Sequence, residues 1–208
     1  MVMNIIKKYF PDLTENQLNQ FEVMMNLYPQ WNEKINVISR KDINNLEVNH
    51  ILHSLALVKF VKFMPNTSVM DLGTGGGFPG LPLAAFYPEV NFHLVDRIGK
   101  KLRVAQEIAE QARLTNVTFQ HGDVLEVKGK YDFVVSRAVM PLEDMVKLVR
   151  RFISKENNNA IPNGLLCLKG GDLEMELRHF KKSVLVDDIS NYFKEDYFKT
   201  KKIVYLPV

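Results

Sequence analysis

The hydrophobic pattern of the chain changes near residue 66. Before this point apolar residues recur every three or four positions, as expected for helices with one buried face: Leu18, Phe21, Met25, Tyr28 and Ile35. A second amphipathic stretch covers about 42–63. These helices precede the first predicted strand, so we interpret residues 1–65 as a helical cap on a domain formed by residues 66–208.

Two local signals describe the first long helix. Thr14 and Gln17 have the spacing of a capping box, in which each side chain satisfies a backbone N–H of the other residue. The helix should therefore begin just after Thr14. Pro29 falls inside the pattern and should kink or divide the helix, because proline has no N–H to donate.

From Ser68 onward, short apolar runs alternate with amphipathic ones. We expect strands at 68–72, 91–96, 117–120, 131–136 and 164–169, and helices near 79–87, 98–113, 141–153 and 172–182. This alternation predicts an α/β fold with a largely parallel sheet covered on both faces. Residues 183–189 and 202–207 are expected to add two antiparallel strands, and the ligand should lie at the carboxyl ends of the first strands.

The segment that follows the first strand is the most informative in the chain. Five glycines occur between Gly73 and Gly80, directly after the strand that carries Asp71. Glycine has no Cβ, so such a backbone can turn at positive φ and let a ligand lie against it. Pro79 can open the next helix. A strand, a glycine-rich turn and a helix in this order are typical of a nucleotide-type cofactor site.

Four groups of residues follow one another at predicted strand ends: Asp71 with Gly73, Gly75 and Gly77; Asp96; Gly122-Asp123-Val124-Leu125; and Asp132 to Arg137. A nicotinamide enzyme needs only the first two, and the segment 75–80 even satisfies its G-x-G-x-x-G pattern. The full series favours S-adenosylmethionine, which carries a sulfonium, an amino acid part and an adenosine.

Each acidic residue has a role in this interpretation. Asp71 would serve the cationic methionine end, Asp96 the ribose, and the turn at Asp123–Leu125 the adenine edge. The alternative for Asp71 and Asp123 is that they only cap a helix or a turn. For Phe78 the alternative is a place in the core, and for Arg137 a structural ion pair.

Composition and charge limit the cellular location and the partners that we expect for this protein. The net charge of +3, from 27 basic and 24 acidic side chains, does not by itself require a nucleic-acid partner. Cys167 is the sole cysteine, no apolar run reaches the roughly 20 residues that span a membrane, and the first residues lack a secretion signal. We therefore expect a cytoplasmic protein without membrane contact. His50 and His53 form H-x-x-H but lack a third ligand, so we expect no metal.

From about Trp31 to Gly171 the chain resembles the glucose-inhibited division protein B family, the small-subunit ribosomal RNA guanine-N7 methyltransferases. The matching motifs are Trp31-Asn32-x-Lys34-x-Asn36, Ser39-Arg40, His50-Ile51-Leu52-x-Ser54, Asp71 to Gly80, Leu81-Pro82-Leu83, Asp96 with Lys100-Lys101, Ser136-Arg137-Ala138 and Leu168-Lys169-Gly170. Two positions depart from the family: His53 replaces a frequent aspartate and Leu125 a frequent glutamate. The second departure suggests that the backbone at Val124-Leu125 contacts adenine.

The resemblance implies a Rossmann-like class I methyltransferase with a seven-stranded, mostly parallel sheet and an N-terminal helical cap. It implies S-adenosylmethionine as cofactor, with contacts at Gly73, Phe78, Val124, Leu125 and Arg137. The implied substrate is N7 of one guanine in 16S rRNA of the small ribosomal subunit. The alternatives are a methyltransferase for a small molecule or a protein, a nicotinamide-dependent oxidoreductase, and a protein that binds the cofactor without turnover.

We expect Arg137 to act in catalysis by holding the guanine edge or the cofactor carboxylate, with Ser136 beside it. Lys169 and the cap segment from Asn49 to His53 would line the RNA entrance. Lys100 and Lys101 would meet phosphates, unless they are simply part of a solvated helix face. The protein is expected to act as a monomer.

Overall fold

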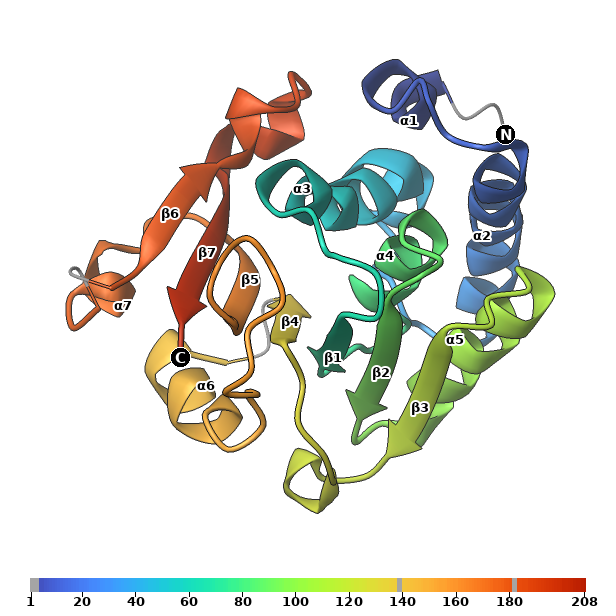
Figure 1. Cartoon of the computed structure of the whole chain (residues 1–208). Helices are drawn as coiled ribbons and strands as arrows, with labels where there is room; N and C mark the ends of the chain where they lie inside the picture. Colours follow the sequence, from blue (N-terminus) through green and yellow to red (C-terminus); the bar gives the residue numbers. More distant parts are fainter. Residues whose placement is uncertain (1–3, 138–139, 181–182) are drawn as a thin grey trace.

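A computed structural model describes residues 4–137, 140–180 and 183–208 of the chain. Its centre is a seven-stranded sheet in the order β3-β2-β1-β4-β5-β7-β6 (Figure 1). The strands are β1 Ser68–Leu72, β2 Asn91–Asp96, β3 Val117–His121, β4 Phe133–Arg137, β5 Gly164–Gly170, β6 Leu185–Asp188 and β7 Lys201–Pro207. Strands β1 to β5 pair in parallel, and β7 runs antiparallel to both β5 and β6. The predicted parallel sheet with an antiparallel finish is confirmed.

The strand order reverses between β1 and β4. From β1 the chain adds β2 and β3 on one side of the sheet, and then returns to add β4 and β5 on the other side. In open α/β sheets this is where the loops after neighbouring strands diverge and leave a crevice. The register aligns Leu72 with Val95, and Asp96 with His121. The acidic residues at the ends of β1 and β2 therefore lie at one edge of the sheet.

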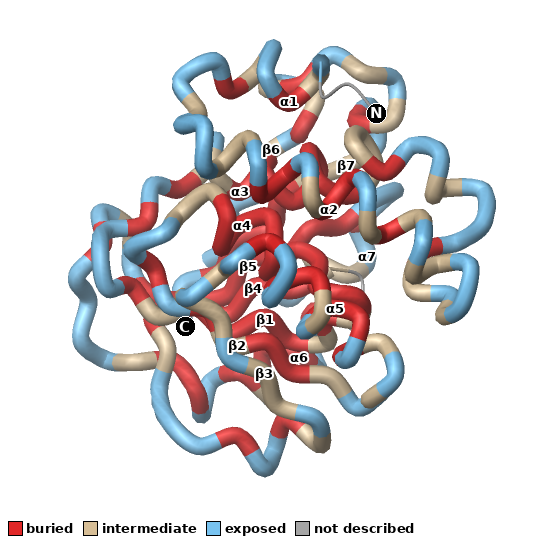
Figure 2. The backbone as a smooth tube through the Cα atoms, turned by 90° about the vertical axis from the view of Figure 1, so that its right-hand side faces the viewer, coloured by how far each residue is buried: buried red, intermediate tan, exposed pale blue. Residues whose placement is uncertain are grey.

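The two faces of the sheet bury separate hydrophobic clusters. Alternate residues of a strand point to opposite faces, and in β1 Val69 joins one cluster while Met70 joins the other. The helices are α1 Asn4–Tyr9, α2 Glu15–Lys34, α3 His53–Phe60, α4 Gly80–Phe86, α5 Gly99–Gln111, α6 Leu142–Val149 and α7 Glu174–Leu177. The cap packs with α4 and α5 on the Val69 face, while α6 packs on the Met70 face. Figure 2 shows that the buried segments concentrate in the strands and adjoining helices.

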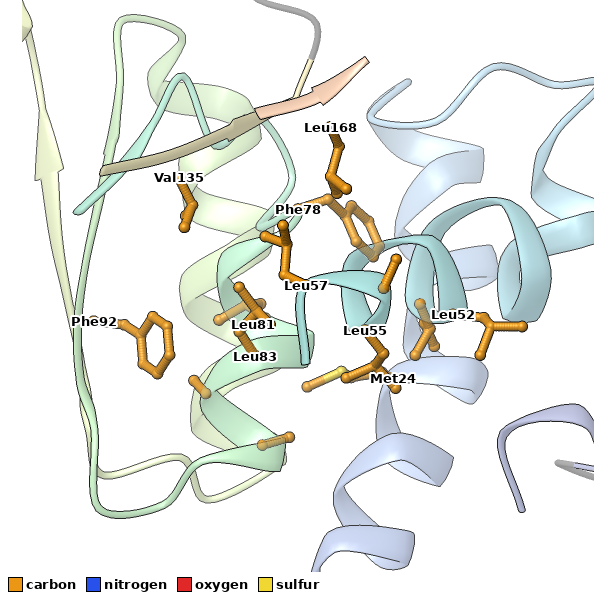
Figure 3. Packing of buried hydrophobic residues seen from close by; sticks show 14 of the residues in the cluster. Met24, Leu52, Leu55, Leu57, Phe78, Leu81, Leu83, Phe92, Val135 and Leu168 are labelled. Atoms are coloured by element: carbon orange, nitrogen blue, oxygen red, sulfur yellow. The ribbon is translucent and has the colours of Figure 1, made fainter. Parts of the chain in front are cut away.

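The cap shares its core with the rest of the molecule. Phe21 of α2 and Leu55 of α3 belong to the same cluster as Val69 and Phe133 of the sheet. Figure 3 shows residues of α2, α3, α4 and the strands in one packed layer. The boundary between 1–65 and 66–208 remains a prediction, since this packing joins the two parts on one face.

The first long helix starts as expected and then continues past the proline. The capping box is confirmed: the Thr14 hydroxyl accepts from the Gln17 N–H at 3.3 Å, and the Gln17 side chain accepts from the Thr14 N–H at 2.9 Å. Of the two effects expected of Pro29, a division of the helix does not occur, because α2 is continuous through it. A kink at Pro29 stays a prediction. A proline removes only one helical hydrogen bond, and burial of Met25 and Tyr28 holds the helix together.

The second cap segment is less regular than predicted. A 3₁₀ turn, η1 (Ile43–Asn45), leads into a π-helical turn, η2 (Glu47–Leu52), and then into α3, which ends at Phe60 rather than at residue 63. The predicted helix at 172–182 is also shorter: only Glu174–Leu177 is α-helical, and positions 181–182 lie outside the described residues. None of the helices in the described ranges combines the length and hydrophobicity needed to cross a bilayer.

Candidate active site

The loop after β1 is held in place by the end of β2. Asp96 accepts hydrogen bonds from the Gly75 N–H at 2.7 Å and from the Ile98 N–H at 2.7 Å, one on each carboxylate oxygen. The N–H groups of Gly73 and Thr74 donate to the Val95 carbonyl. The first two predicted groups of site residues are therefore joined, and Asp96 keeps unused lone pairs on both oxygens.

Glycine is required in this loop for two different reasons. Gly75 has φ +58°, and a Cβ added there would meet no described atom within 4 Å, so this backbone faces open space. Gly77 has φ +102°, and its Cβ would come within 2.6 Å of Leu81 Cδ1. Gly75 thus leaves room for a ligand, whereas Gly77 lets the loop pack tightly on α4.

Asp71 is fully buried beneath this loop. Its Oδ2 accepts from the Thr74 hydroxyl at 2.6 Å and from the Gly80 N–H at 2.7 Å, so it does cap the start of α4. Its Oδ1 has no partner among the described residues. Burial raises the pKa of Asp71 to about 7, although the hydrogen bonds from Thr74 and Gly80 oppose the rise. An unpartnered buried carboxylate oxygen suits a cationic ligand group.

A cavity opens beside Asp96 and the loop. Its lining includes Leu72, Gly73, Val95, Asp96, Gly122, Val124 and Met140. Its walls are mainly apolar, with Asp96 and Arg97 at its polar edge. This suits a nucleoside, whose base is apolar on its faces and whose sugar is polar. The predicted ribose-binding acid and adenine-binding turn therefore border one hollow.

The turn after β3 is stabilised by its own acid. Asp123 Oδ1 accepts from the Leu125 N–H at 2.9 Å and caps a 3₁₀ turn, η3 (Val124–Glu126), while Oδ2 pairs with Arg97. The hydrogen bond from Leu125 leads the causes that lower the pKa of Asp123. The capping alternative thus describes Asp123 in this structure. The Leu125 side chain is exposed and its N–H is occupied, which leaves Val124 as the member of this pair that lines the cavity.

A second group of side chains surrounds Phe78. The ring stacks on Tyr28 with centroids 4.6 Å apart, lies 5.2 Å from the His50 ring, and carries the Arg137 guanidinium 5.0 Å above its centroid. Figure 3 shows Phe78 in the packed layer that holds Leu57 of α3 and Leu168 of β5. Phe78 therefore belongs to the core and also supports a cation at the end of β4.

Arg137 is half-buried against this group and forms no ion pair with any residue that the structure describes. Burial lowers the pKa of its guanidinium, and the charges and hydroxyls of Tyr197, Asp71, Tyr28 and Asp42 act against that effect from longer range. Its motif neighbour Ala138 lies outside the described residues. The guanidinium of the half-buried Arg137 is thus a donor set suited to an anion or a base edge.

The cap contributes two histidines at this point, and both are buried. The Tyr197 hydroxyl is 3.2 Å from His53 Nδ1 and also donates to the Asn49 carbonyl. The Asn49 side chain donates to Asp42. Burial, and after it Arg137, lowers the pKa of His50 to about 3 and places that of His53 well below its usual range. Both rings are neutral at pH 7, and the expected RNA contact at His53 is not at the surface.

Three other predicted residues, Ser136, Lys169 and Lys101, either form hydrogen bonds or ion pairs within the protein or are only partly exposed. The Ser136 hydroxyl is fully buried and donates to the Leu72 carbonyl at 2.8 Å, which ties β4 to β1. Lys169 is 9% exposed and pairs with Glu176 at 2.5 Å. At the start of α5, Lys100 is exposed and Lys101 is half-buried. Of the expected RNA-facing lysines, only Lys100 is free in solvent.

Several residues of the site were not predicted from the sequence. Tyr28 lies on the apolar face of α2, so its spacing indicated only core packing. Tyr197 comes from a 3₁₀ turn near the C-terminus, η5 (Asp196–Thr200), and it contacts Asn49 and His53 from the other end of the chain. No local pattern marks either residue, since their role depends on contacts made across the fold.

The Tyr28 hydroxyl connects the cap with the glycine loop by donating to the Gly76 carbonyl at 2.7 Å. We expect Tyr28→Phe to lower the free energy of unfolding by about 1–2 kcal/mol, because it removes one buried hydrogen bond. Urea denaturation of both proteins measures the loss. Tyr205→Phe is a matched control, since Tyr205 donates to the Pro162 carbonyl at 2.6 Å. An unchanged stability in Tyr28→Phe beside a loss in Tyr205→Phe would contradict the prediction.

Comparison with known proteins gives a consistent set of similarities. A family model described as rRNA small subunit methyltransferase G matches residues 17–204. A protein from Phocaeicola vulgatus named Ribosomal RNA small subunit methyltransferase G is 58% identical over 206 residues, covering 99% of each chain. A protein of the same name from Bacteroides thetaiotaomicron is 58% identical over 203 residues, covering 98% of each.

Solved structures share the fold at low identity. A SAM-dependent methyltransferase from Aquifex aeolicus superposes with a TM-score of 0.55 at 15% identity, covering 82% of this chain and 100% of that one. Precorrin-6y C5,15-methyltransferase from Geobacter metallireducens gives 0.54 at 12%, covering 84% and 92%. These likenesses agree with the seven-stranded Rossmann-like sheet.

Proposed function

Because the chain belongs to the rRNA small subunit methyltransferase G family, we propose that it transfers a methyl group from S-adenosylmethionine to N7 of one guanine in 16S rRNA. It is an S-adenosylmethionine-dependent rRNA methyltransferase of the α/β class. The observation that carries the proposal is the family match over residues 17–204, which includes the whole glycine loop and the Arg137 strand end. A methyltransferase for a small molecule or a protein is not favoured by these similarities.

The cofactor suits the residues that border the loop. When bound, S-adenosylmethionine supplies a methyl group activated by a sulfonium. Asp71 Oδ1 would hold its amino group, because this oxygen is buried and unpartnered. Asp96 would hold the ribose, and the hollow beside Val95 and Val124 would hold the adenine. Gly75 would keep the approach to the loop open.

Methylation of guanine N7 requires the protein to orient the two reactants and does not require a general base. N7 has an exposed lone pair and needs no deprotonation before attack. The residues around Phe78 would hold the guanine in line with the methyl group and exclude water. Arg137 would anchor either the base edge or the cofactor carboxylate, and Ser136 would keep β4 aligned with β1.

The RNA would be recognised through an unstacked base, because the major groove of an A-form helix is too narrow for side chains. Lys100 and the exposed Arg97 would contact phosphates at the rim. We propose that the protein acts as a monomer in the cytoplasm, with residues 1–65 as a cap over the base-binding end. The described residues contain no cluster of three metal-ligating side chains, and the proposed reaction uses none.

Because the pKa of Asp71 is raised, we expect the affinity for the cofactor to depend on pH. With a pKa of about 7 in the free protein, Asp71 is mostly protonated below that pH, and binding the cationic amino group requires its ionised form. We expect affinity to rise about tenfold from pH 5.5 to pH 7, where an ordinary α-amino group is still charged. Calorimetry at several pH values tests this. Asp71→Asn should bind more weakly, with little dependence on pH, and a flat wild-type profile would refute the assignment.

The experiment that tests the function is methyl transfer from labelled S-adenosylmethionine to small ribosomal subunits from cells lacking this protein. Cleavage at N7-methylguanine maps the label. We expect label at one guanine, on subunits or on extracted rRNA, and none with a protein carrying Asp71→Asn. Label at another atom or on several bases would refute the N7 assignment. No label despite cofactor binding would refute the RNA substrate for this chain.

A further inference from the structure

His50 is a buried histidine whose two ring nitrogens both lack a hydrogen-bond partner among the described residues. Its ring is 8% exposed. By contrast, His53 meets Tyr197 through Nδ1, and the more exposed His93 meets Thr118. Buried polar atoms are nearly always paired in native proteins, so two unpaired nitrogens on one ring call for an explanation.

The position of His50 points to a ligand rather than to a packing defect. It lies in the π-helical turn η2, and π-helical turns are rare and frequent at functional sites. Its ring rests on Phe78, which also supports the Arg137 guanidinium. The unpartnered Oδ1 of Asp71 lies under the loop that carries Phe78. His50 of the cap and Arg137 of the sheet thus meet at one aromatic ring.

The charge state of His50 decides which ligand group it can bind. Burial and the charge of Arg137 lower the pKa of His50 to about 3, while Asp42 acts in the opposite direction, so the ring is neutral at pH 7. The neighbouring His53 is also neutral, because burial and Arg137 place its pKa well below the usual range. A neutral imidazole has one nitrogen that accepts a hydrogen bond, which neither Arg137 nor a lysine can do. The site therefore holds a neutral acceptor next to a cation.

We propose that His50 contacts the methyl-accepting guanine and accepts a hydrogen bond from N1–H on its Watson–Crick edge. This inference rests on the proposed function and adds a base-contacting residue to it. N7 forms a bond to the methyl carbon as the carbon–sulfur bond breaks, and the positive charge moves from sulfur to the guanine ring. N1–H then becomes a stronger donor, and its proton stays on the base.

A neutral acceptor is the favourable choice for this reaction. The hydrogen bond to N1–H strengthens as charge develops, so it stabilises the transition state more than the bound substrate. A cation at the same place would repel the methylated base. N7 lies on the Hoogsteen edge rather than on the Watson–Crick edge, so a contact to N1–H would leave N7 free to face the methyl group.

The test compares two side chains of similar length, His50→Gln and His50→Met, in single-turnover methylation of small subunits. Glutamine can accept a hydrogen bond and methionine is apolar. We expect His50→Met to be slower than wild type by about 30-fold, and His50→Gln to recover about tenfold of that loss. Both should bind S-adenosylmethionine within about twofold of wild type, because the altered contact is to the base. His93→Phe is the control and should leave the rate unchanged.

A modified substrate separates base contact from a structural role. Subunits carrying 1-methylguanine at the mapped position lack the N1–H donor. We expect them to slow the wild type by about 30-fold and His50→Met by less than about threefold, because the two changes remove one interaction. An equal slowing of both proteins would overturn the proposal. So would equal rates for the Gln and Met variants, a His50→Met rate within about threefold of wild type, or a loss of cofactor affinity that matches the loss of rate. If the wild type labels no guanine N7, the proposed function itself fails.

Discussion

Replacing Arg137 with alanine should lower single-turnover methylation by at least about 100-fold. Arg137 lies at the end of β4, is half-buried with its guanidinium over the Phe78 ring, and has no ion-pair partner among the described residues. It is therefore an unused donor set at the sheet edge where we propose that cofactor and base meet. Removing it would take away either the anchor of the cofactor carboxylate or that of the base.

Stability measurements separate this loss from misfolding. A half-buried cation that has no ion-pair partner among the described residues loses hydration without compensation, so its removal should leave the melting temperature unchanged or raise it. Arg137→Lys should recover little activity, because an ammonium lacks the planar fork of donors. Arg150→Ala, at the exposed end of α6, is the matched control and should behave as wild type. Wild-type affinity and turnover in Arg137→Ala would exclude Arg137 from the site.

Gly75→Val should weaken cofactor binding by about 100-fold or more while the protein still folds. The added side chain would enter the open space in front of the loop, where no described atom lies within 4 Å of the Cβ position. The positive φ of +58° adds strain of about 1–2 kcal/mol in a branched residue. Calorimetric titration with S-adenosylmethionine measures the first effect, and urea denaturation the second.

Gly129 offers a closely matched control for this variant. It also has positive φ, at +110°, and a Cβ there would also meet nothing described within 4 Å. It lies between η3 and β4 and does not line the cavity. Gly129→Val should therefore lose a similar amount of stability and keep its cofactor affinity. Equal affinity in the two variants would show that Gly75 does not face the cofactor.

The two ends of the site differ in how completely their groups are already bonded. At the adenine end, Asp123 and Arg97 pair with each other, and Asp123 also holds the turn. At the methionine and base end, Asp71, His50 and Arg137 all retain unused capacity. Burying a polar group without a partner costs free energy. Contacts that a ligand makes at the second end should therefore contribute most to its binding free energy. This is why the largest expected effects involve Arg137 and the loop beside Asp71.

The amino-acid sequence alone was enough to predict the succession of strands and helices along the chain, the parallel sheet with its two antiparallel strands, and the glycine loop. These features follow from hydrophobic period and from backbone conformation, which depend on neighbouring residues. The carboxylates at the ends of β1 and β2 could be predicted for the same reason. Parallel strands bring their carboxyl ends to one edge whatever the details of packing.

Only the tertiary structure decided which distant side chains meet and which are buried. Pro29 stays inside one helix because the buried face of α2 outweighs one lost hydrogen bond. Lys169 pairs with Glu176, and His53 lies against Tyr197 from the other end of the chain. Such pairings depend on how whole elements pack, which no local spacing encodes. The grouping of His50, Phe78 and Arg137 arises in the same way, because cap and sheet must first share one core.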